Sequence, residues 1–381
     1  MRSVVAGVMI GAWLSAAPVH AMEVAADTTA NVPVAADAAT LSRFVPRPAN
    51  TTRFDYGYWD DALDEIVFYG GPNLRLRASR PIETATRIPF GHTSTYRLEG
   101  NRVMFEYLKD EDRAGLMDYV RDLEALANVH DIASLPREEQ LAFWLNLHNA
   151  VVVAAVADDY KVRRPSRTKD EQERRFHDIP RVTIAGVALS LRDIREGIVY
   201  PNWRDPFVVY GFFRGDIGSP SIPTRAFAGG TVWEMLRRLG GDYANGLRGF
   251  DTTFGPARVS DIYFEAAPWL FPDFETDVRA HIRPLLTEEL RAQLDGQRGR
   301  LRRVPYETTV ADLTGGQGIR TKYAKSLLGN GTVTNVESYI LEHVRKRETL
   351  RRRGLLSGTV IIEDIPTVDP DLPREDTAAG E

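Results

Sequence analysis

The sequence contains no cysteine among its 381 residues. A chain without cysteine forms no disulfide bonds and carries no thiol nucleophile. It also lacks thiolate ligands for a metal ion and the cysteine to which a bacterial lipid anchor is attached. Thiol catalysis, thiolate metal centres and lipid anchoring at a processed cysteine are therefore excluded.

An excess of basic residues is also missing. The formal net charge is −5, and it becomes about −6 without residues 1–21, in which Arg2 is the only charged residue. This balance disfavours sequence-independent binding to a polyanion, so we expect no nucleic-acid partner. A hydrophobic content of 43% and a charged content of 27% are typical of a soluble globular protein.

Residues 1–21 predict a cleaved signal peptide. Arg2 supplies the positive start, residues 4–17 form an uncharged and largely apolar run, and Val19 and Ala21 place small side chains at the cleavage site. The alternative is an uncleaved anchor, but the apolar run is shorter than the roughly 20 residues that cross a bilayer. We expect a periplasmic or secreted protein with no transmembrane segment after signal cleavage.

Composition divides the remaining chain into three parts. Residues 22–50 lack a helical or strand period and predict a flexible leader. Residues 51–355 are expected to form one large domain, and residues 356–381 an acidic tail. The basic cluster at 345–353, which precedes the tail, predicts a solvated helix face or, alternatively, a contact with anionic lipid head groups.

The most distinctive segment is residues 141–157, LAFWLNLHNAVVVAAVA, which carry no acidic or basic charge. A helix that is apolar on every side is either central to a core or a membrane span. Because polar side chains interrupt this run, we predict a buried central helix. Residues 161–178 are charged and aperiodic and predict a surface loop, whereas residues 257–265 predict a strand. Helices and strands alternate irregularly, so we expect an α+β fold.

Several motifs occur in an order that resembles a known family. FWLNLHNA at 143–150 is followed by a Val-x-Ile-x-Gly hairpin at 182–186, a Leu-Ser-Leu-x-Asp-Ile helix start at 189–194, and an apolar run at 207–213 that predicts a strand. Over residues 100–275 this order resembles the family called domain of unknown function 547. That family is distantly similar to papain-like cysteine peptidases, which implies a central helix packed on an antiparallel sheet.

The chain departs from the family pattern after residue 207. Many members read approximately His-Phe-Ala-Leu-x-Cys-Gly-x-x-Ser-Cys-Pro, whereas here Val209 stands at the histidine, Arg214 at the first cysteine and Ser219 at the second. A thiolate mechanism needs both the sulfur and a nearby base. If the cysteines of the family are catalytic, this chain has lost or replaced that chemistry.

Ser219 is the candidate catalytic residue, because it lies in a glycine-punctuated turn after the predicted strand. A serine nucleophile needs a histidine within hydrogen-bond reach, and the available ones are His92, His130, His148, His177, His281 and His343. The alternative is a turn serine that binds its own backbone.

Five other residues are candidates for a cleft. Asn146, His148 and Asn149 are polar positions in the apolar helix, where they either open onto a pocket or satisfy buried backbone groups. Arg214 and Asp216 either hold an anionic ligand or form an ion pair with each other.

Two functions therefore remain open. The first is a non-catalytic protein that binds a peptide, glycan or protein partner in the cell envelope. The second is a serine-type hydrolase or acyl transferase that uses Ser219. The histidines show no paired metal spacing such as His-Glu-x-x-His, so we expect no metal site and no cofactor.

Overall fold

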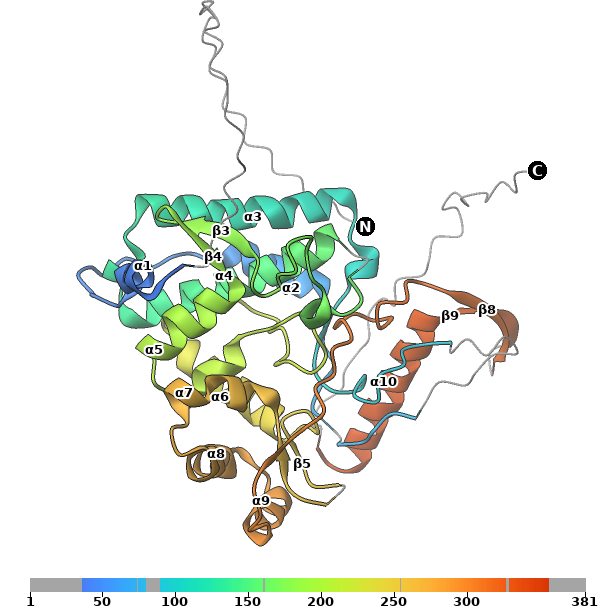
Figure 1. Cartoon of the computed structure of the whole chain (residues 1–381). Helices are drawn as coiled ribbons and strands as arrows, with labels where there is room; N and C mark the ends of the chain where they lie inside the picture. The colour runs from blue at the N-terminus through green and yellow to red at the C-terminus, as the bar shows by residue number, and fades with distance from the viewer. Residues whose placement is uncertain are drawn as a thin grey trace, which may run out of the picture. The chain divides into compact units, whose positions relative to one another are not determined.

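The computed structural model describes residues 36–73, 75–79, 90–159, 162–253, 255–326 and 329–355. Helices and small sheets are intermixed along this part of the chain (Figure 1), which confirms the α+β class. The predicted signal peptide at 1–21 and the acidic tail at 356–381 lie outside the described residues.

Helices supply most of the ordered structure. The α-helices are α1 (Ala38–Leu41), α2 (Gly57–Ile66), α3 (Asp110–Val129), α4 (Arg137–Asp158), α5 (Tyr200–Asn202), α6 (Val232–Ala244), α7 (Asp261–Leu270), α8 (Phe274–Ile282), α9 (Glu288–Gly296) and α10 (Asn335–Arg352). A π-helix, η5, spans Asp193–Val199, and two short 3-10 helices matter below, η4 (Pro165–Arg167) and η6 (Pro206–Gly211).

The strands form four small sheets. Three are antiparallel pairs, β1 (Val67–Phe68) with β2 (Arg102–Val103), β3 (Pro180–Ile184) with β4 (Val187–Ser190), and β8 (Thr321–Ser326) with β9 (Gly329–Thr334). The fourth contains β5 (Phe250–Asp251), β6 (Arg258–Val259) and β7 (Arg302–Arg303), with β6 parallel to β7. The β3–β4 pair is the hairpin expected around residues 182–186.

Helix α4 is the buried central helix that its charge-free sequence predicts. Every residue from Glu139 to Ala154 is buried, on all sides of the helix. Among the described residues α4 is also the one helix long and apolar enough to cross a membrane, yet 94% of its most apolar window is buried inside the protein. Burial of this kind is typical of a core helix.

The neighbours of α4 differ from those expected. It packs mainly on α3, η5 and α6 (Figure 1). The expectation of an antiparallel sheet packed on this helix is not confirmed by these contacts. The reason lies partly in residues 207–213, which were expected to form a buried strand but largely belong to 3-10 helix η6. Asp205 begins that turn, because its carboxylate accepts a hydrogen bond from the N–H of Phe207 and Pro206 favours the first helical turn.

Residues 36–50, which were expected to belong to a flexible leader, contain ordered structure. Residues 36–50 include α1, whose Leu41 is buried close to Gly197 of η5. Phe44 packs edge-on against Trp144 of α4, with ring centroids 5.2 Å apart. The two side chains bury apolar surface against the core, which stabilises this segment although its sequence has no helical period.

Candidate functional site

Asn146 and Asn149 of α4 bind the backbone of distant segments. The Asn146 side chain donates a hydrogen bond to the carbonyl of Phe227 (2.8 Å) and accepts one from its N–H (2.9 Å). Asn149 donates to the carbonyl of Gly211 (2.9 Å) and accepts from the N–H of Phe213 (3.0 Å). Both amides therefore satisfy buried backbone groups, which is the structural alternative stated above.

His148 connects the helix to a charged cluster. Its Nε2 lies 3.1 Å from Nη1 of Arg195, and its Nδ1 lies 3.2 Å from Oδ1 of Asn149. A guanidinium only donates, so Nε2 of His148 accepts and Nδ1 carries the proton. Burial and the charge of Arg195 lower the pKa of His148 well below its usual range, and the ring is neutral.

Arg195 and Arg214 share one carboxylate, that of Glu265 on α7. Arg214 donates two hydrogen bonds to it, at 2.9 and 2.7 Å, and Arg195 donates from Nε at 3.2 Å. Tyr200 adds a hydroxyl donor at 3.2 Å. Burial opposes ionisation, but the two arginines lower the pKa of Glu265 to about 2. The cluster therefore carries two positive charges and one negative charge.

The Arg214–Asp216 ion pair considered from the sequence does not form, because Arg214 binds Glu265. Asp216 is 1% exposed and its carboxyl contacts Ser166 of η4 through the hydroxyl and the N–H. Burial raises the pKa of Asp216 to about 8. Arg214 and Asp216 thus lie in one turn but have different partners. Arg214 keeps its charge beside Glu265, whereas burial disfavours the charged form of Asp216.

Ser219 binds the backbone of its own turn. It is fully buried, its Oγ lies 2.7 Å from the carbonyl oxygen of Asp216, and it accepts a hydrogen bond from the N–H of Arg214 at 3.2 Å. None of the hydrogen bonds that the described residues form with Ser219 involves a histidine. This geometry favours the alternative of a turn serine, because both hydrogen-bonding functions of the Ser219 hydroxyl close the turn.

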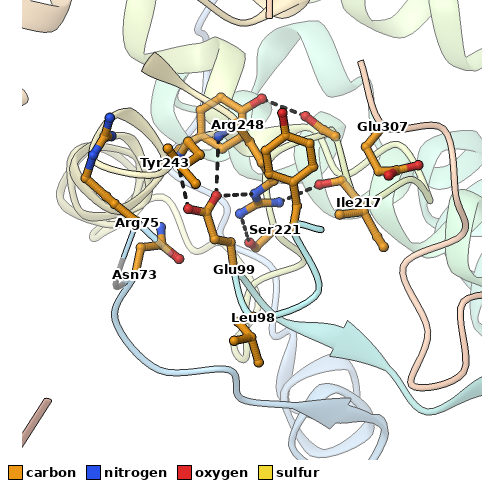
Figure 2. A network of polar contacts seen from close by, with 12 residues as sticks. Asn73, Arg75, Leu98, Glu99, Ile217, Ser221, Tyr243, Arg248 and Glu307 are labelled. Carbon is orange, nitrogen blue, oxygen red and sulfur yellow. Dashed lines mark hydrogen bonds and ion pairs between the residues drawn. The ribbon is translucent and has the colours of Figure 1, made fainter. Parts of the chain in front are cut away.

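A second buried ion pair holds the same turn from another side. Figure 2 shows Glu99 and Arg248 with their partners. Arg248 donates to the carbonyls of Ile217 (2.7 Å) and Ser219 (2.9 Å), and its Nε lies 3.5 Å from the Glu99 carboxylate. Glu99 accepts from the N–H of Leu247 at 2.8 Å. Residues 217–219 are thereby fixed by side chains that are themselves almost fully buried.

The charged cluster forms part of the wall of a cavity of about 330 Å³. Five arginines line it, which are Arg167, Arg175, Arg192, Arg195 and Arg214. Other wall residues are Ser166, His177, Tyr306, Glu265 and Asp261. A concave site lined by several guanidinium groups has the chemistry that binds carboxylate, phosphate or sulfate groups.

The charges around this cavity do not cancel. Arg192 pairs with Asp178 at 2.9 Å, and Asp261 pairs with Arg303. Arg167 and Arg175 are exposed, and within the described part of the chain neither side chain has a hydrogen-bond or ion-pair partner. Together with the excess charge of the Glu265 cluster, they leave the cavity positive.

Buried N–H groups of His177 and Arg214, in the wall of the cavity, lack acceptors among the described residues. His177 and Arg214 are 7% and 6% exposed. Nε2 of His177 and Nε of Arg214 have no hydrogen-bond partner among the described residues. Nδ1 of His177 lies 3.5 Å from Nη1 of Arg195, so it is the accepting nitrogen and Nε2 carries the proton. Burial and the charges of Arg195 and Arg214 keep this ring neutral by lowering its pKa well below the usual range.

The structure brings together only part of the residues chosen from the sequence. Arg214 lines the cavity, and Asp216 lies behind Ser166. His148 reaches the cluster through Arg195, whereas Asn146, Asn149 and Ser219 serve the backbone. Sequence reasoning missed several wall residues, above all Arg167, Arg175, His177, Arg195 and Glu265. Within the described residues, no group of three or more histidines and carboxylates is placed to hold a metal ion.

Comparison with known proteins identifies one family. Residues 132–243 match the family described as "Protein of unknown function, DUF547", within the range 100–275 over which the sequence resembles it. The matched segment, which is similar to this family, includes α4, η5, η6 and α6. No curated protein and no solved structure matches the chain.

Proposed function

We propose that the protein is an exported, non-catalytic binding protein whose ligand presents an anionic group to the arginine-lined cavity. The observation that carries this proposal is the pair of buried N–H donors, on His177 and Arg214, that have no acceptor among the described residues. A buried donor without an acceptor costs roughly 1–3 kcal/mol. An anion with several oxygen atoms supplies the missing acceptors.

Electrostatics favours the same class of ligand. The exposed Arg167 and Arg175 stand at a cavity whose inner wall already has one more positive charge than negative. Like charges at close range repel, and an anion relieves that repulsion while its own charge is compensated. A neutral ligand with acceptor oxygens could bind the two donors but would leave the charge excess uncompensated, and a cationic ligand would add to it.

The ligand class follows from the compartment. Residues 1–21 support export to a periplasm, where peptides with a free carboxylate and acidic glycans are both present. The shared recognition chemistry is a carboxylate or an equivalent anion. We also propose that the fold is distantly related to that of papain-like peptidases. It is supported by the long buried helix α4 beside a turn in which Arg214 and Ser219 replace two cysteines of the family pattern.

Titration calorimetry on the chain without residues 1–21 tests the proposal. The probes are sulfate, an acetylated tripeptide with a free or an amidated C-terminus, and glucuronate with glucose as its neutral counterpart. We expect sulfate to bind and at least one charged probe to bind more tightly than its neutral counterpart. A preference for the peptide or for glucuronate then separates the two sources of the carboxylate.

Substitutions place the binding in the cavity. Arg167→Gln combined with Arg175→Gln removes two exposed charges without a folded-state partner, and we expect roughly tenfold weaker binding. Arg300→Gln is the matched control, because Arg300 is exposed and does not line the cavity. Equal affinity of the double variant and the control, or no binding of any anionic probe, contradicts the proposal.

A further inference from the structure

We infer that Asp216, in its protonated form, turns the hydroxyl proton of Ser166 toward the ligand and thereby makes anion binding stronger at neutral than at alkaline pH. This inference rests on the proposed function, since it concerns the same cavity. It assigns a positioning role to a carboxyl group that does not line the cavity itself.

The surroundings of Asp216 favour the protonated form. Its side chain is almost completely buried, and no cation within the described residues forms an ion pair with it. The arginine nearest in sequence, Arg214, is bound to Glu265 instead. A buried carboxylate without a paired cation is strongly disfavoured, so the group keeps its proton. The pKa of Asp216, which burial raises to about 8, agrees with this geometry.

The proton on Asp216 decides the direction of one hydrogen bond. The Asp216 carboxyl and the Ser166 hydroxyl are in contact, and Ser166 lines the cavity. If Asp216 is ionised, it only accepts, and the Ser166 proton points to it. If Asp216 is protonated, it donates to Ser166, and the hydroxyl proton of Ser166 becomes available to a ligand oxygen. With Asp216 protonated, the Asp216–Ser166 pair keeps both of its protons, and only the directions of the two O–H bonds differ.

Ionisation of Asp216 therefore has two effects on the cavity, and both lower its affinity for an anion. It withdraws the Ser166 donor, and it places a negative charge directly behind the cavity wall. Both effects weaken the binding of an anion at alkaline pH.

The other groups around Asp216 do not titrate in the same range. The Tyr306 side chain also interacts with Asp216 and Ser166, but burial raises its pKa well above its usual value, so its hydroxyl stays protonated. Arg214 stays charged beside Glu265. Glu265 has a pKa of about 2, and the pKa of His177 is well below the usual value for histidine. Val310 meets Asp216 through the backbone, as an isolated β-bridge, and brings no charge.

The test is the affinity for sulfate between pH 6.5 and pH 9, measured by titration calorimetry. Sulfate keeps its charge throughout this range, so a change in affinity reports on the protein. We expect the wild type to bind roughly tenfold more weakly at pH 9 than at pH 6.5. In Asp216→Asn the amide donates to Ser166 at every pH, and the affinity becomes independent of pH.

A second variant tests the inference independently, in case Asp216→Asn does not fold. Ser166→Ala removes the donor itself, so its affinity at pH 6.5 falls part of the way to the wild-type value at pH 9. Its affinity then changes less with pH, because only the charge of Asp216 still varies. Ser338→Ala, on α10, is the control and behaves like the wild type. Equal pH profiles for wild type, Asp216→Asn and Ser166→Ala overturn this inference while the proposed function stands. Absence of sulfate binding at every pH in the wild type overturns both.

Discussion

The guanidinium of Arg195 lies between His148 and Glu265, 3.1 Å from Nε2 of the histidine and 3.2 Å from the carboxylate. One side chain thus connects the central helix α4 to the wall of the arginine-lined cavity. Because His148 stays neutral, the ion-pair partner of Arg195 within the described residues is Glu265, which Arg214 shares. The stability of the core and the charge of the cavity therefore depend on the same carboxylate.

Removal of that carboxylate is expected to be costly. Glu265→Gln leaves two buried guanidinium groups without a counter-charge, and we expect a loss of about 3 kcal/mol in the free energy of unfolding. Glu171→Gln is the control, because Glu171 is exposed. Urea denaturation at pH 7 measures both.

The same variant predicts the acid response. The pKa of Glu265 in the folded protein, about 2, lies below the ordinary value of 4.5, so its contribution is complete above about pH 4.5 and is lost as the pH falls toward 2. The stability difference between wild type and Glu265→Gln must therefore shrink over that interval. A difference that stays constant down to pH 2 shows that the carboxylate is not held by the arginines.

Asn146 is expected to be a stability residue. Asn146→Ala leaves the N–H and the carbonyl of Phe227 without partners in the core, which predicts a loss of about 3 kcal/mol. Asn128→Ala on the exposed side of α3 changes stability by less than about 0.5 kcal/mol. Thermal and urea unfolding of both variants provide the comparison. Similar stability of the two variants would show that the two hydrogen bonds between Asn146 and the Phe227 backbone contribute little.

Ser219 is expected to remain unmodified by a fluorophosphonate probe. In Ser219→Ala the N–H of Arg214 loses its acceptor, so we expect about 1–2 kcal/mol of destabilisation. Intact-mass spectrometry after incubation with the probe, followed by denaturation, measures both effects. A label on the wild type that disappears in Ser219→Ala would instead support the hydrolase alternative.

Lys346 gives a prediction for the alkaline range. Its amine is buried and donates to the carbonyls of Gly70 (2.8 Å) and Leu98 (2.6 Å). Burial lowers its pKa to about 7 from the ordinary 10.5, so the unfolded chain binds the proton more tightly and the wild type gains stability as the pH rises from 7 to 10.5. Lys346→Met is therefore expected to cost about 1–3 kcal/mol at pH 9 and less at pH 7. Arg345→Met, whose side chain is exposed, is the control. Urea unfolding at both pH values would contradict the prediction if the cost decreased with rising pH.

The central helix was predictable because its evidence is local. Seventeen consecutive residues without charge, from 141 to 157, define a buried helix without any knowledge of its neighbours. The roles of Asn146 and Asn149 were not predictable to the same degree. Their partners lie 81 and between 62 and 64 residues away, and no local pattern encodes such contacts.

The cavity was not predictable from the sequence, for a different reason. Arg167, Arg175 and His177 lie in the segment 161–178, whose charges follow no period and so resembled an ordinary surface loop. Glu265 lies in a segment expected to be a strand, but Ser260 begins α7, because its hydroxyl accepts from the N–H of Ile262. The basic cluster at 345–353 is exposed for the most part, yet Lys346 is buried, because the folded chain offers it carbonyl oxygens that the sequence does not reveal.

Helix α4 also limits how the chain can change in length. Asn146 and Asn149 hold two separate segments at positions three residues apart on one helix. One inserted residue between them would rotate Asn149 by about 100° around the helix axis relative to Asn146. A shift of the helix could then restore the hydrogen bonds of one asparagine but not those of both. Substitutions of similar volume in α4 are therefore easier to accommodate than any insertion or deletion. Residues 171–173, which are exposed, do not line the cavity and bind no distant segment of the described chain, can vary in length at far lower cost.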